Sequence, residues 1–361
     1  MQEAPIHGQI LRNCARLLLD TNRMDDRVLL ALPSKGAIAE PTLNFLRDAG
    51  LRVDKPNERQ YVGSVPAISG LSVLFQRVKD VVYKVADGTV QLGITGLDVV
   101  RENPSDEIVL LHPELGYGHC QLVVAVPEDW VDVTTMTDLV EIASDFRRLY
   151  GRTMRVATTY AHMTRDYFHA RGLHYFTLVK AEGAIEAAPT IGYADIIVDL
   201  VQTGTTLREN HLRPLSDGTI VEAQACLIAN RTALKSSPHA LKVAQHMLEF
   251  IDAALLGRRY RQLTVNIRGI SPEDVAAKVS GSELTRGLRG PTIAPIFGVA
   301  QSEQADSWYT VTLNVEAHHV LEAVTHLRSV GSSEIVVSPV NAIFLNESHS
   351  FQCVLNELGL A

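Results

Sequence analysis

The chain has 361 residues, of which 46% are hydrophobic and 20% are charged, and its formal net charge is −8. This length exceeds one ordinary hydrophobic core and predicts two or three domains. The acidic balance and the lack of a basic block argue against a nucleic-acid binder, and no apolar run is long enough to span a bilayer. Four scattered cysteines without a C-x-x-C pair, and a start without a secretory pattern, favour reduced thiols in the cytoplasm.

The first part of the chain predicts alternating strands and helices. Residues 1–26 carry an amphipathic pattern and are expected to form an added helix before the first strand. The elements expected next are a strand over 28–32, a helix that ends at Gly50, a strand over 72–78, a helix over 79–86 and a strand over 90–95. Such alternation is typical of a largely parallel sheet with helices on both faces.

A second alternating unit begins at the apolar strand 121–126. The elements expected in it are a helix over 135–149, a strand over 154–159, a helix over 161–171, and strands over 175–181 and 196–200. One further apolar strand, over 220–229, is expected to carry the chain back to the first unit. Two α/β lobes joined in this way leave a cleft, and ligands of open α/β sheets bind at the carboxyl ends of the strands. Those ends carry Ser34-Lys35-Gly36, Thr95-Gly96 and Thr203–Thr206.

The turn Thr203–Thr206 follows a short apolar strand and opens a helix, which predicts a phosphate site. Backbone N–H groups and hydroxyls at a helix start favour an anion. Asp195 and Asp199 are spaced to face one side of the strand, where they are expected to hold sugar hydroxyls or a phosphate-bound cation. No lysine follows the glycine, which excludes the G-x-x-x-x-G-K-[ST] loop. A phosphate beside a polyol indicates a sugar phosphate such as phosphoribosyl diphosphate; the alternative is an ordinary turn with a threonine N-cap.

The pattern changes after Gly257. The elements expected there are strand 263–267, helix 271–278, extended segment 291–297, strand 309–315, helix 317–328 and strand 334–338. This βαββαβ order is the split ferredoxin-like arrangement, which is common in small-molecule-sensing domains.

The turn and its surroundings carry a family resemblance. The residues Glu186, Gly192, Ala194, Asp199, Thr203, Gly204, Thr206 and Leu207 match, at the expected spacing, the signature of the ATP phosphoribosyltransferases. Segments 32–36, 87–88, 92–98 and 114–118 match as well, and the resemblance extends from about Arg27 to Phe344. The last segment resembles the histidine-binding regulatory domain of the long-form enzymes. Two departures are the first 26 residues, which have no counterpart, and the absence of a proline after Asp80-Val81.

The resemblance implies an α/β fold with a two-lobed core like periplasmic binding proteins and a C-terminal ferredoxin-like, ACT-like domain. The implied parts are an extension over 1–26, lobe I over 27–120 with a return segment over 220–257, lobe II over 121–219, and the regulatory domain over 258–361. It also implies a homo-oligomer between dimer and hexamer, dependence on Mg²⁺, and feedback inhibition by histidine.

The implied reaction joins N1 of the adenine of ATP to C1′ of phosphoribosyl diphosphate and releases diphosphate, as the first step of histidine biosynthesis. The residues expected to bind phosphoribosyl diphosphate are Asp195, Asp199, Thr203, Gly204, Thr205 and Thr206, with Asp199 and Lys35 in catalytic roles. The residues expected at the nucleotide are Arg77, Asp80, Thr95, Gly96, Asp98 and Glu114, and Ser332 and Ser333 are expected at the effector pocket. Mg²⁺ is expected to be held chiefly by the diphosphate and water.

Structural alternatives stay open for several of these residues. Lys35 also fits a solvated lysine, Arg77 and Asp80 fit an ion pair at a helix entry, and Asp98 fits an N-cap. The alternatives for the whole chain are a non-catalytic two-lobed sensor or regulatory paralogue, or transfer to another base. His319, Glu322 and His326 fall on one helical face, but we expect no protein-held metal there, because no H-E-x-x-H or cysteine partner accompanies them.

Overall fold

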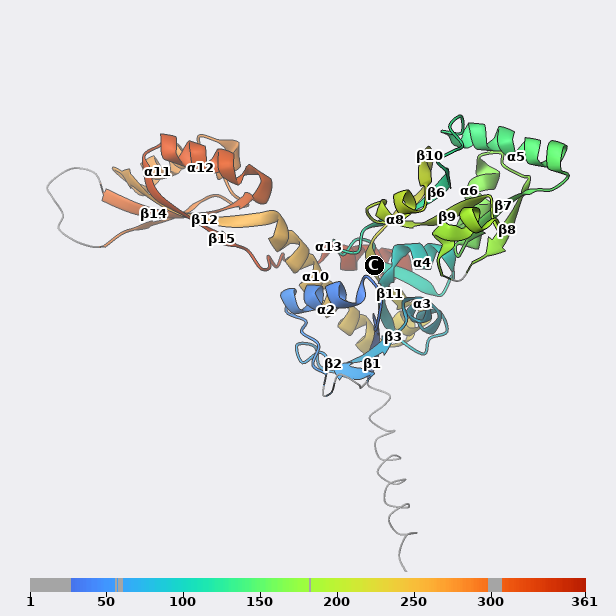
Figure 1. The fold of residues 1–361 in the computed structure, drawn as a ribbon. Coiled ribbons are helices and arrows are strands. Elements are labelled where there is room, and N and C mark those ends of the chain that lie inside the picture. Colours follow the sequence, from blue (N-terminus) through green and yellow to red (C-terminus); the bar gives the residue numbers. More distant parts are fainter. Residues whose placement is uncertain (1–26, 56, 58–60, 182, 298–306) are drawn as a thin grey trace, which may run out of the picture. The chain divides into compact units, whose positions relative to one another are not determined.

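The computed structural model of the chain describes residues 27–55, 57, 61–181, 183–297 and 307–361. The helix expected over 1–26 lies outside the described residues. Contacts divide the chain into two compact units, whose elements are labelled in Figure 1. The first unit consists of Met1–Phe45, Arg52–His246 and Ser350–Ala361, and the second of Leu46–Leu51 and Met247–His349.

The first lobe of the first unit is built on a six-stranded mixed sheet of order β2-β3-β1-β4-β11-β5. Its strands are β1 (Val28–Pro33), β2 (Val62–Ser64), β3 (Leu71–Gln76), β4 (Leu92–Gly96), β5 (Ile108–His112) and β11 (Ala225–Asn230). Its helices are α2 (Ala39–Asp48), α3 (Val78–Ala86), α4 (Leu97–Glu102) and α9 (Arg231–Ser236). The strands β3, β1 and β4 run parallel, whereas β2 and β11 pair antiparallel. The sheet expected to be largely parallel thus contains two antiparallel strands: β2 at one edge, and β11, which enters from the other lobe.

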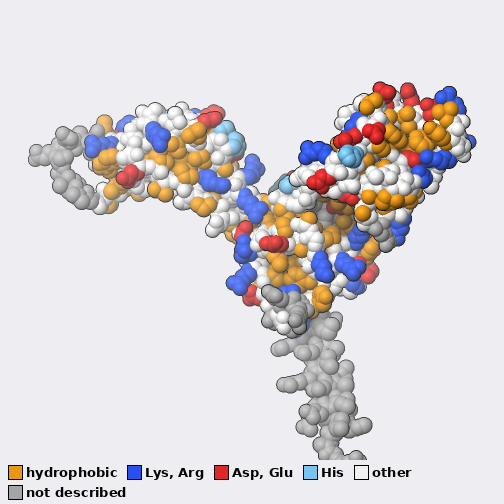
Figure 2. Space-filling model, in the orientation of Figure 1, with side chains coloured by type: hydrophobic (Ala, Val, Ile, Leu, Met, Phe, Trp, Pro, Cys, Tyr) orange, Lys and Arg blue, Asp and Glu red, His pale blue; other side chains and the backbone are white. Residues whose placement is uncertain are grey.

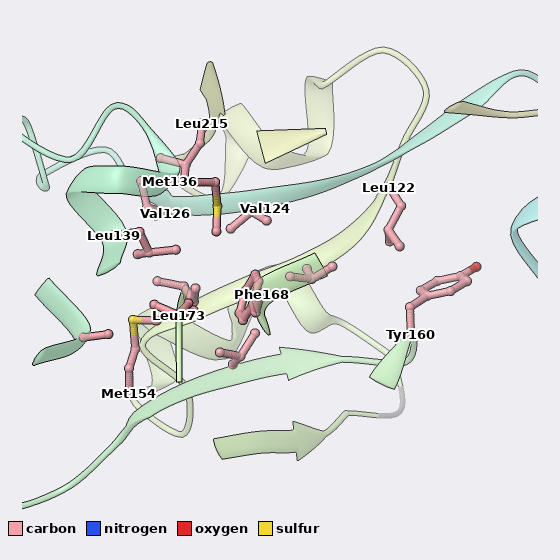
Figure 3. Packing of buried hydrophobic residues seen from close by; sticks show 14 of the residues in the cluster. Leu122, Val124, Val126, Met136, Leu139, Met154, Tyr160, Phe168, Leu173 and Leu215 are labelled. Atoms are coloured by element: carbon pink, nitrogen blue, oxygen red, sulfur yellow. The ribbon is translucent and has the colours of Figure 1, made fainter. Parts of the chain in front are cut away.

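The second lobe of the first unit has a five-stranded sheet of order β10-β6-β9-β7-β8. Its strands are β6 (Cys120–Pro127), β7 (Met154–Thr158), β8 (Phe176–Lys180), β9 (Ile196–Val201) and β10 (Leu212–Ala223). Its helices are α5 (Met136–Tyr150), α6 (Ala161–Ala170), α7 (Ala188–Ile191) and α8 (Thr205–Glu209), with a 3₁₀ turn η1 at Ile185–Ala187. Leu122, Met136 and Phe168 lie in its buried core, and Tyr160 lies at the edge of that core in Figure 3.

The return of the chain from the second lobe to the first differs from expectation. The single strand expected over 220–229 is divided at Gln224, with β10 in one sheet and β11 in the other. The carbonyl of Gln224 accepts from Leu97 N at 2.9 Å, and its side-chain amide oxygen accepts from Gly116 N at 2.8 Å. Both strands are apolar, so the sequence pattern alone does not mark the residue where the chain leaves one sheet.

The second unit confirms the ferredoxin-like arrangement. Its elements are β12 (Tyr260–Gly269), α11 (Pro272–Val279), η2 (Glu283–Thr285), β13 (Thr292–Pro295), β14 (Ser307–Glu316), η3 (Ala317–His319), α12 (Val320–Ser329) and β15 (Ser332–Pro339). The sheet order is β13-β14-β12-β15, and each neighbouring pair is antiparallel. Val265, Val275 and Leu327 are among the residues of its own buried core.

The unit boundaries depart from the expected domain limits at three points, the first of which is Leu46–Leu51, expected in lobe I but grouped with the second unit. Helix α10 (Pro238–Arg259) continues across the expected limit at 257, and the division falls between His246 and Met247. The last helix, α13 (His349–Leu358), was not expected, and from Ser350 on it belongs to the first unit. Its Val354 and Leu358 are buried, and Glu357 Oε1 lies 2.7 Å from Arg231 Nη2. A chain cut near residue 257 would therefore lose part of the first unit.

The surface carries charges of both signs. On the face shown in Figure 2, lysine and arginine side chains are intermingled with aspartate and glutamate side chains. Among the described residues, no helix combines the length and the apolar character that crossing a membrane requires.

Candidate functional site

A cavity of about 450 Å³ lies in the first unit and takes its lining from both lobes. This volume is within the range of small-molecule sites. The first lobe contributes the loop after β1, the start of α3 and the junction of β4 with α4, and the second lobe contributes Tyr160, the end of β9 and the start of α8. The cavity therefore lies where the strand ends predicted a cleft.

The predicted phosphate turn borders this cavity. Thr203, Gly204 and Thr206 line it, whereas Thr205 does not. Gly204 is the N-cap of α8 and has φ of +72°, a left-handed conformation that glycine adopts without steric cost. The hydroxyl of Thr205 lies 3.1 Å from that of Thr203. The turn thus presents two hydroxyls and the start of a short helix to the cavity.

Asp199 is the carboxylate of β9 that reaches the cavity. Burial raises the pKa of Asp199 to about 6, against the effect of the hydrogen bond that Leu200 N donates at 2.8 Å. Glu186 also lines the cavity, and its negative charge adds to the rise in the pKa of Asp199. A carboxylate in such surroundings gains from a cation or from hydroxyl donors, which restore the solvation that burial removed.

Asp195 has a different environment from the one predicted. It precedes β9, its side chain is 8% exposed, and it is not among the cavity-lining residues. Its carboxylate pairs with Arg152 Nη1 at 2.6 Å and with Arg155 Nη2 at 3.0 Å. Burial would raise the pKa of Asp195, but the hydrogen bonds from Arg152 and Arg155 outweigh it and hold the pKa at about 2. Asp195 therefore holds the two arginines in place. Both of its carboxylate oxygens already accept hydrogen bonds from them, which leaves neither oxygen to accept from a sugar hydroxyl.

The residues predicted at the nucleotide separate into two groups. Gly96 and Asp98, at the junction of β4 and α4, line the cavity. A Cβ on Gly96 would collide with the Asp98 carboxylate where it now lies, so the glycine lets this side chain fold over the strand end. The buried Thr95 donates its hydroxyl to the carbonyl of Val78 at 3.0 Å. The other residues predicted at the nucleotide, Arg77, Asp80, Thr95 and Glu114, do not line this cavity, and neither does Lys35, which was predicted in a catalytic role.

Among the other lining residues, four have titratable side chains that were not predicted as site residues: Lys79, Cys120, Tyr160 and Glu186. The Tyr160 hydroxyl donates to Asp98 Oδ2 at 2.7 Å, and burial together with that carboxylate raises the pKa of Tyr160. Burial, and to a lesser degree Asp98, raises the pKa of Cys120 to about 11, so this thiol stays protonated. Of these four residues, Glu186 belongs to the family signature matched in the sequence, so the sequence contained a signal for it.

The second unit has a smaller cavity of about 270 Å³, lined by residues that include Tyr260, Asn314 and His319. Neither Ser332 nor Ser333 lines it, although the buried Ser332 Oγ lacks a hydrogen-bond partner among the described residues. Of the three residues on the helical face discussed above, His326 is directed elsewhere. Its Nε2 lies 3.3 Å from the carbonyls of Lys278 and Val279.

The structure instead brings Glu316, His318 and His319 together, with one possible ligand atom from each within 4.8 Å of the others. His319 Nδ1 also lies 3.1 Å from Glu322 Oε2. His318 is exposed and the other two are half-buried, so this is a surface cluster.

Two family models and several known proteins are similar to the chain. The family model for ATP phosphoribosyltransferase matches residues 77–252, and the model for the HisG C-terminal domain matches residues 258–342. ATP phosphoribosyltransferase 2, chloroplastic, of Arabidopsis thaliana is 36% identical over 337 residues, which make up 93% of this chain and 81% of that protein. The ATP phosphoribosyltransferase of Bradyrhizobium sp. (strain ORS 278) is 34% identical over 331 residues, 91% of this chain and 97% of the relative.

A third relative is shorter. The ATP phosphoribosyltransferase of Brucella melitensis biotype 2 (strain ATCC 23457) is 46% identical over 208 residues, which cover 56% of this chain and 90% of the relative. Relatives of this kind carry the same name without matching the whole of this chain.

Proposed function

The chain belongs to the ATP phosphoribosyltransferase family, and from this premise we propose that the cavity of its first unit is the place of reaction. The enzyme transfers the phosphoribosyl group of phosphoribosyl diphosphate to N1 of the adenine of ATP and releases diphosphate, in the first step of histidine biosynthesis. One observation carries the assignment of the site: Thr203, Thr206 and Asp199 of one lobe border the same cavity as Gly96 and Asp98 of the other.

Substitution at C1′ passes through a loose transition state with positive charge on the ribose. The enzyme therefore has to align the two substrates and stabilise the departing diphosphate, and it needs no protein nucleophile. In the proposed arrangement the Thr203–Thr206 turn binds the 5′-phosphate, Asp199 accepts from the ribose hydroxyls, and Gly96 with Asp98 faces the adenine nucleotide. Asp195 and Thr205 are left out of the proposed site, because neither lines the cavity.

The charges of the cavity support a role for Mg²⁺. Among the described residues, the carboxylates of Asp98, Glu186 and Asp199 line it, against the single ammonium group of Lys79. Two polyphosphate substrates beside these carboxylates require added positive charge, which oxygen-ligated Mg²⁺ supplies. The diphosphate and water would hold the ion, and the Asp199 and Glu186 carboxylates, which line the same cavity, would add negative charge that favours it. We propose that turnover depends on Mg²⁺.

Thr206→Ala is expected to raise the KM for phosphoribosyl diphosphate, because the variant loses a hydroxyl that bonds a charged phosphate. Such a bond is worth about 1.5–3 kcal/mol, which corresponds to roughly a tenfold to hundredfold effect. Initial rates at varied phosphoribosyl diphosphate and saturating ATP measure it.

The matched control for this prediction is Thr205→Ala in the same turn, since the Thr205 side chain does not line the cavity. Its KM is expected to stay within about twofold of the wild type, because the backbone N–H groups remain. An equal increase of the KM in Thr205→Ala and Thr206→Ala would show that the threonines stabilise the turn, and would contradict a specific contact between the Thr206 hydroxyl and the phosphate.

We further propose that the second unit binds histidine and inhibits the first. Its ferredoxin-like topology and its match to the HisG C-terminal domain support this role. The turn at Ser332 and Ser333 remains the proposed edge of the effector pocket; the Ser332 hydroxyl is buried and has no hydrogen-bond partner among the described residues. We also propose that the protein is cytoplasmic and forms a homo-oligomer between dimer and hexamer. Light scattering after gel filtration tests the oligomeric state.

The central experiment is an assay of the full chain with ATP, phosphoribosyl diphosphate and Mg²⁺, with and without millimolar histidine. We expect turnover that histidine suppresses and that chelation with EDTA abolishes. Turnover without suppression would contradict the regulatory proposal and leave the enzyme in place. Turnover that survives EDTA would contradict the role of Mg²⁺. The full chain is required, because a cut near residue 257 also removes α13 from the first unit.

A further inference from the structure

Helix α6 in the second lobe has no N-terminal cap of its own. Its N-cap residue is Tyr160, whose side chain makes no capping hydrogen bond, and its first turn holds no acidic residue. The first N–H groups of a helix have no partner within the helix and carry partial positive charge. The local sequence therefore leaves the start of α6 in need of an acceptor from elsewhere.

Glu102, the last residue of α4 in the first lobe, supplies that acceptor. Its Oε1 accepts from His162 N at 2.9 Å, and its Oε2 accepts from Met163 N at 3.1 Å. Both carboxylate oxygens are thus used on consecutive amides of the first turn of α6. A charged acceptor on backbone N–H groups makes the stronger kind of hydrogen bond.

The other end of α4 contacts the same helix start. Asp98 lies four residues before Glu102, which puts both side chains on one face of α4. Asp98 Oδ2 accepts from the hydroxyl of Tyr160 at 2.7 Å, and Tyr160 is only 6% exposed. In Figure 3 the ring of Tyr160 lies at the edge of the second-lobe core, with its hydroxyl directed away from the packed side chains. Helix α4 thus contacts the start of α6 at two points.

We infer that Glu102 is a positioning residue of the enzyme, which fixes the first turn of α6 on α4 and thereby holds Tyr160 against Asp98 in the cavity. The inference rests on the proposed function of the cavity. Asp98 is the group that faces the nucleotide in that proposal, and its orientation depends on a tyrosine anchored in the opposite lobe. Glu102 itself does not line the cavity. Its removal is therefore expected to act on the reaction through Asp98.

The test compares Glu102→Ala with the wild type at a temperature where both are folded. We expect kcat/KM for ATP to fall about tenfold to a hundredfold, since small displacements of a positioning group are costly. In a Tyr160→Phe background the same substitution is expected to change kcat/KM by less than about twofold, because the link to Asp98 is already broken. Glu102→Gln, which keeps one acceptor oxygen, is expected to recover part of the loss.

Asp138→Ala provides the matched control for a lost helix cap. Asp138 Oδ2 accepts from Thr134 N at 2.9 Å and from Thr135 N at 2.8 Å at the start of α5, whose residues do not line the cavity. This variant is expected to lower the Tm and to leave kcat/KM for ATP within about twofold of the wild type. If Glu102→Ala behaves in the same way, Glu102 is a helix cap only and the inference is wrong.

The dissociation constant of Mg·ATP, measured by calorimetry on the same variants, separates the inference from the proposed function. If the wild type binds ATP but does not turn over, the proposed function is contradicted. Even then, an ATP affinity that is weaker in Glu102→Ala and unchanged in Asp138→Ala would support the inference. An unchanged affinity together with an unchanged kcat/KM overturns it. Full additivity of the Glu102 and Tyr160 effects would also overturn it, since additivity excludes a shared path.

Discussion

The variant Asp199→Asn is expected to lower kcat/KM for phosphoribosyl diphosphate by about a hundredfold to a thousandfold. The ionised carboxylate accepts from the ribose hydroxyls and opposes the positive charge that develops on the sugar, and removing one such preorganised electrostatic partner has effects of that size. Asparagine keeps the shape and one acceptor oxygen but loses the charge. Steady-state rates at saturating ATP and Mg²⁺ measure the loss. A change of less than about threefold would exclude Asp199 from the reaction centre.

The pH profile gives Asp199 a second signature. Burial, with a contribution from Glu186, raises the pKa of Asp199 to about 6 in the free enzyme. Since the ionised form is the active one, kcat/KM is expected to fall as the pH drops below about 6. The Asp199→Asn variant should lack this inflection. An inflection that persists in the variant belongs to the substrate or to another group.

The same raised pKa predicts the opposite effect on stability. Asp199 binds its proton more tightly in the folded enzyme than an unburied aspartate does, because burial raises its pKa. The stability it contributes is fully present below the unfolded pKa and is lost as the pH rises through about 6. At pH 7 the half-buried charge therefore destabilises the fold. Asp199→Asn should raise the Tm by roughly 2–4 °C, for about 1 kcal/mol after solvent screening, and the gain should vanish in acid.

The second large effect is expected for Lys79→Met. Lys79 is exposed, lies in the first turn of α3, and is the one cation among the residues that line the cavity. We propose that its ammonium group pairs with a phosphate of the bound substrates. The loss of a charged hydrogen bond is worth about 1.5–3 kcal/mol, so kcat/KM is expected to fall roughly tenfold to a hundredfold. Methionine keeps the length and apolar stem of the side chain, which limits changes in packing.

Lys84→Met is the matched control for Lys79, because Lys84 lies in the last turn of the same helix and does not line the cavity. The control also removes one positive charge from the first lobe. It is expected to leave kcat/KM within about twofold of the wild type. Equal losses in the two variants would indicate that the overall charge of α3 matters, and would contradict a contact between Lys79 and phosphate.

Several parts of the fold and of the site were predictable because they depend on neighbours in sequence. The helices around residues 135–149 and 161–171 follow from apolar periodicity, and the structure has them at Met136–Tyr150 and Ala161–Ala170. The βαββαβ order after residue 257 follows from the same signal and is confirmed by the sheet order. The Thr203–Thr206 turn follows from local turn chemistry, since glycine adopts the positive φ that the helix start requires.

Other features depend on residues far apart in the chain. The spacing of Asp195 and Asp199 would place both on one face of a strand. In the structure Asp195 precedes β9, and its carboxylate forms ion pairs with Arg152 and Arg155. Spacing cannot predict a partner some 40 residues away. Most of the last helix, α13, belongs to the first unit, and no local sequence pattern predicts this return of the chain. Helix α10 is continuous from Pro238 to Arg259, and this likewise hides the limit between the two units at His246 and Met247.

The sequence by itself determined the family, the alternation of strands and helices and the position of the Thr203–Thr206 turn, because periodicity, turn residues and a spaced signature are local properties of the chain. Only the tertiary structure decided which side chains meet in the cavity. Lys79, Tyr160 and Asp98 come from different elements and lie together because two lobes pack there. Glu102 has the appearance of a solvated helix residue in the sequence, and its partners are the amides of a helix about 60 residues away. Such contacts depend on how the lobes are packed, and the linear pattern does not contain that information.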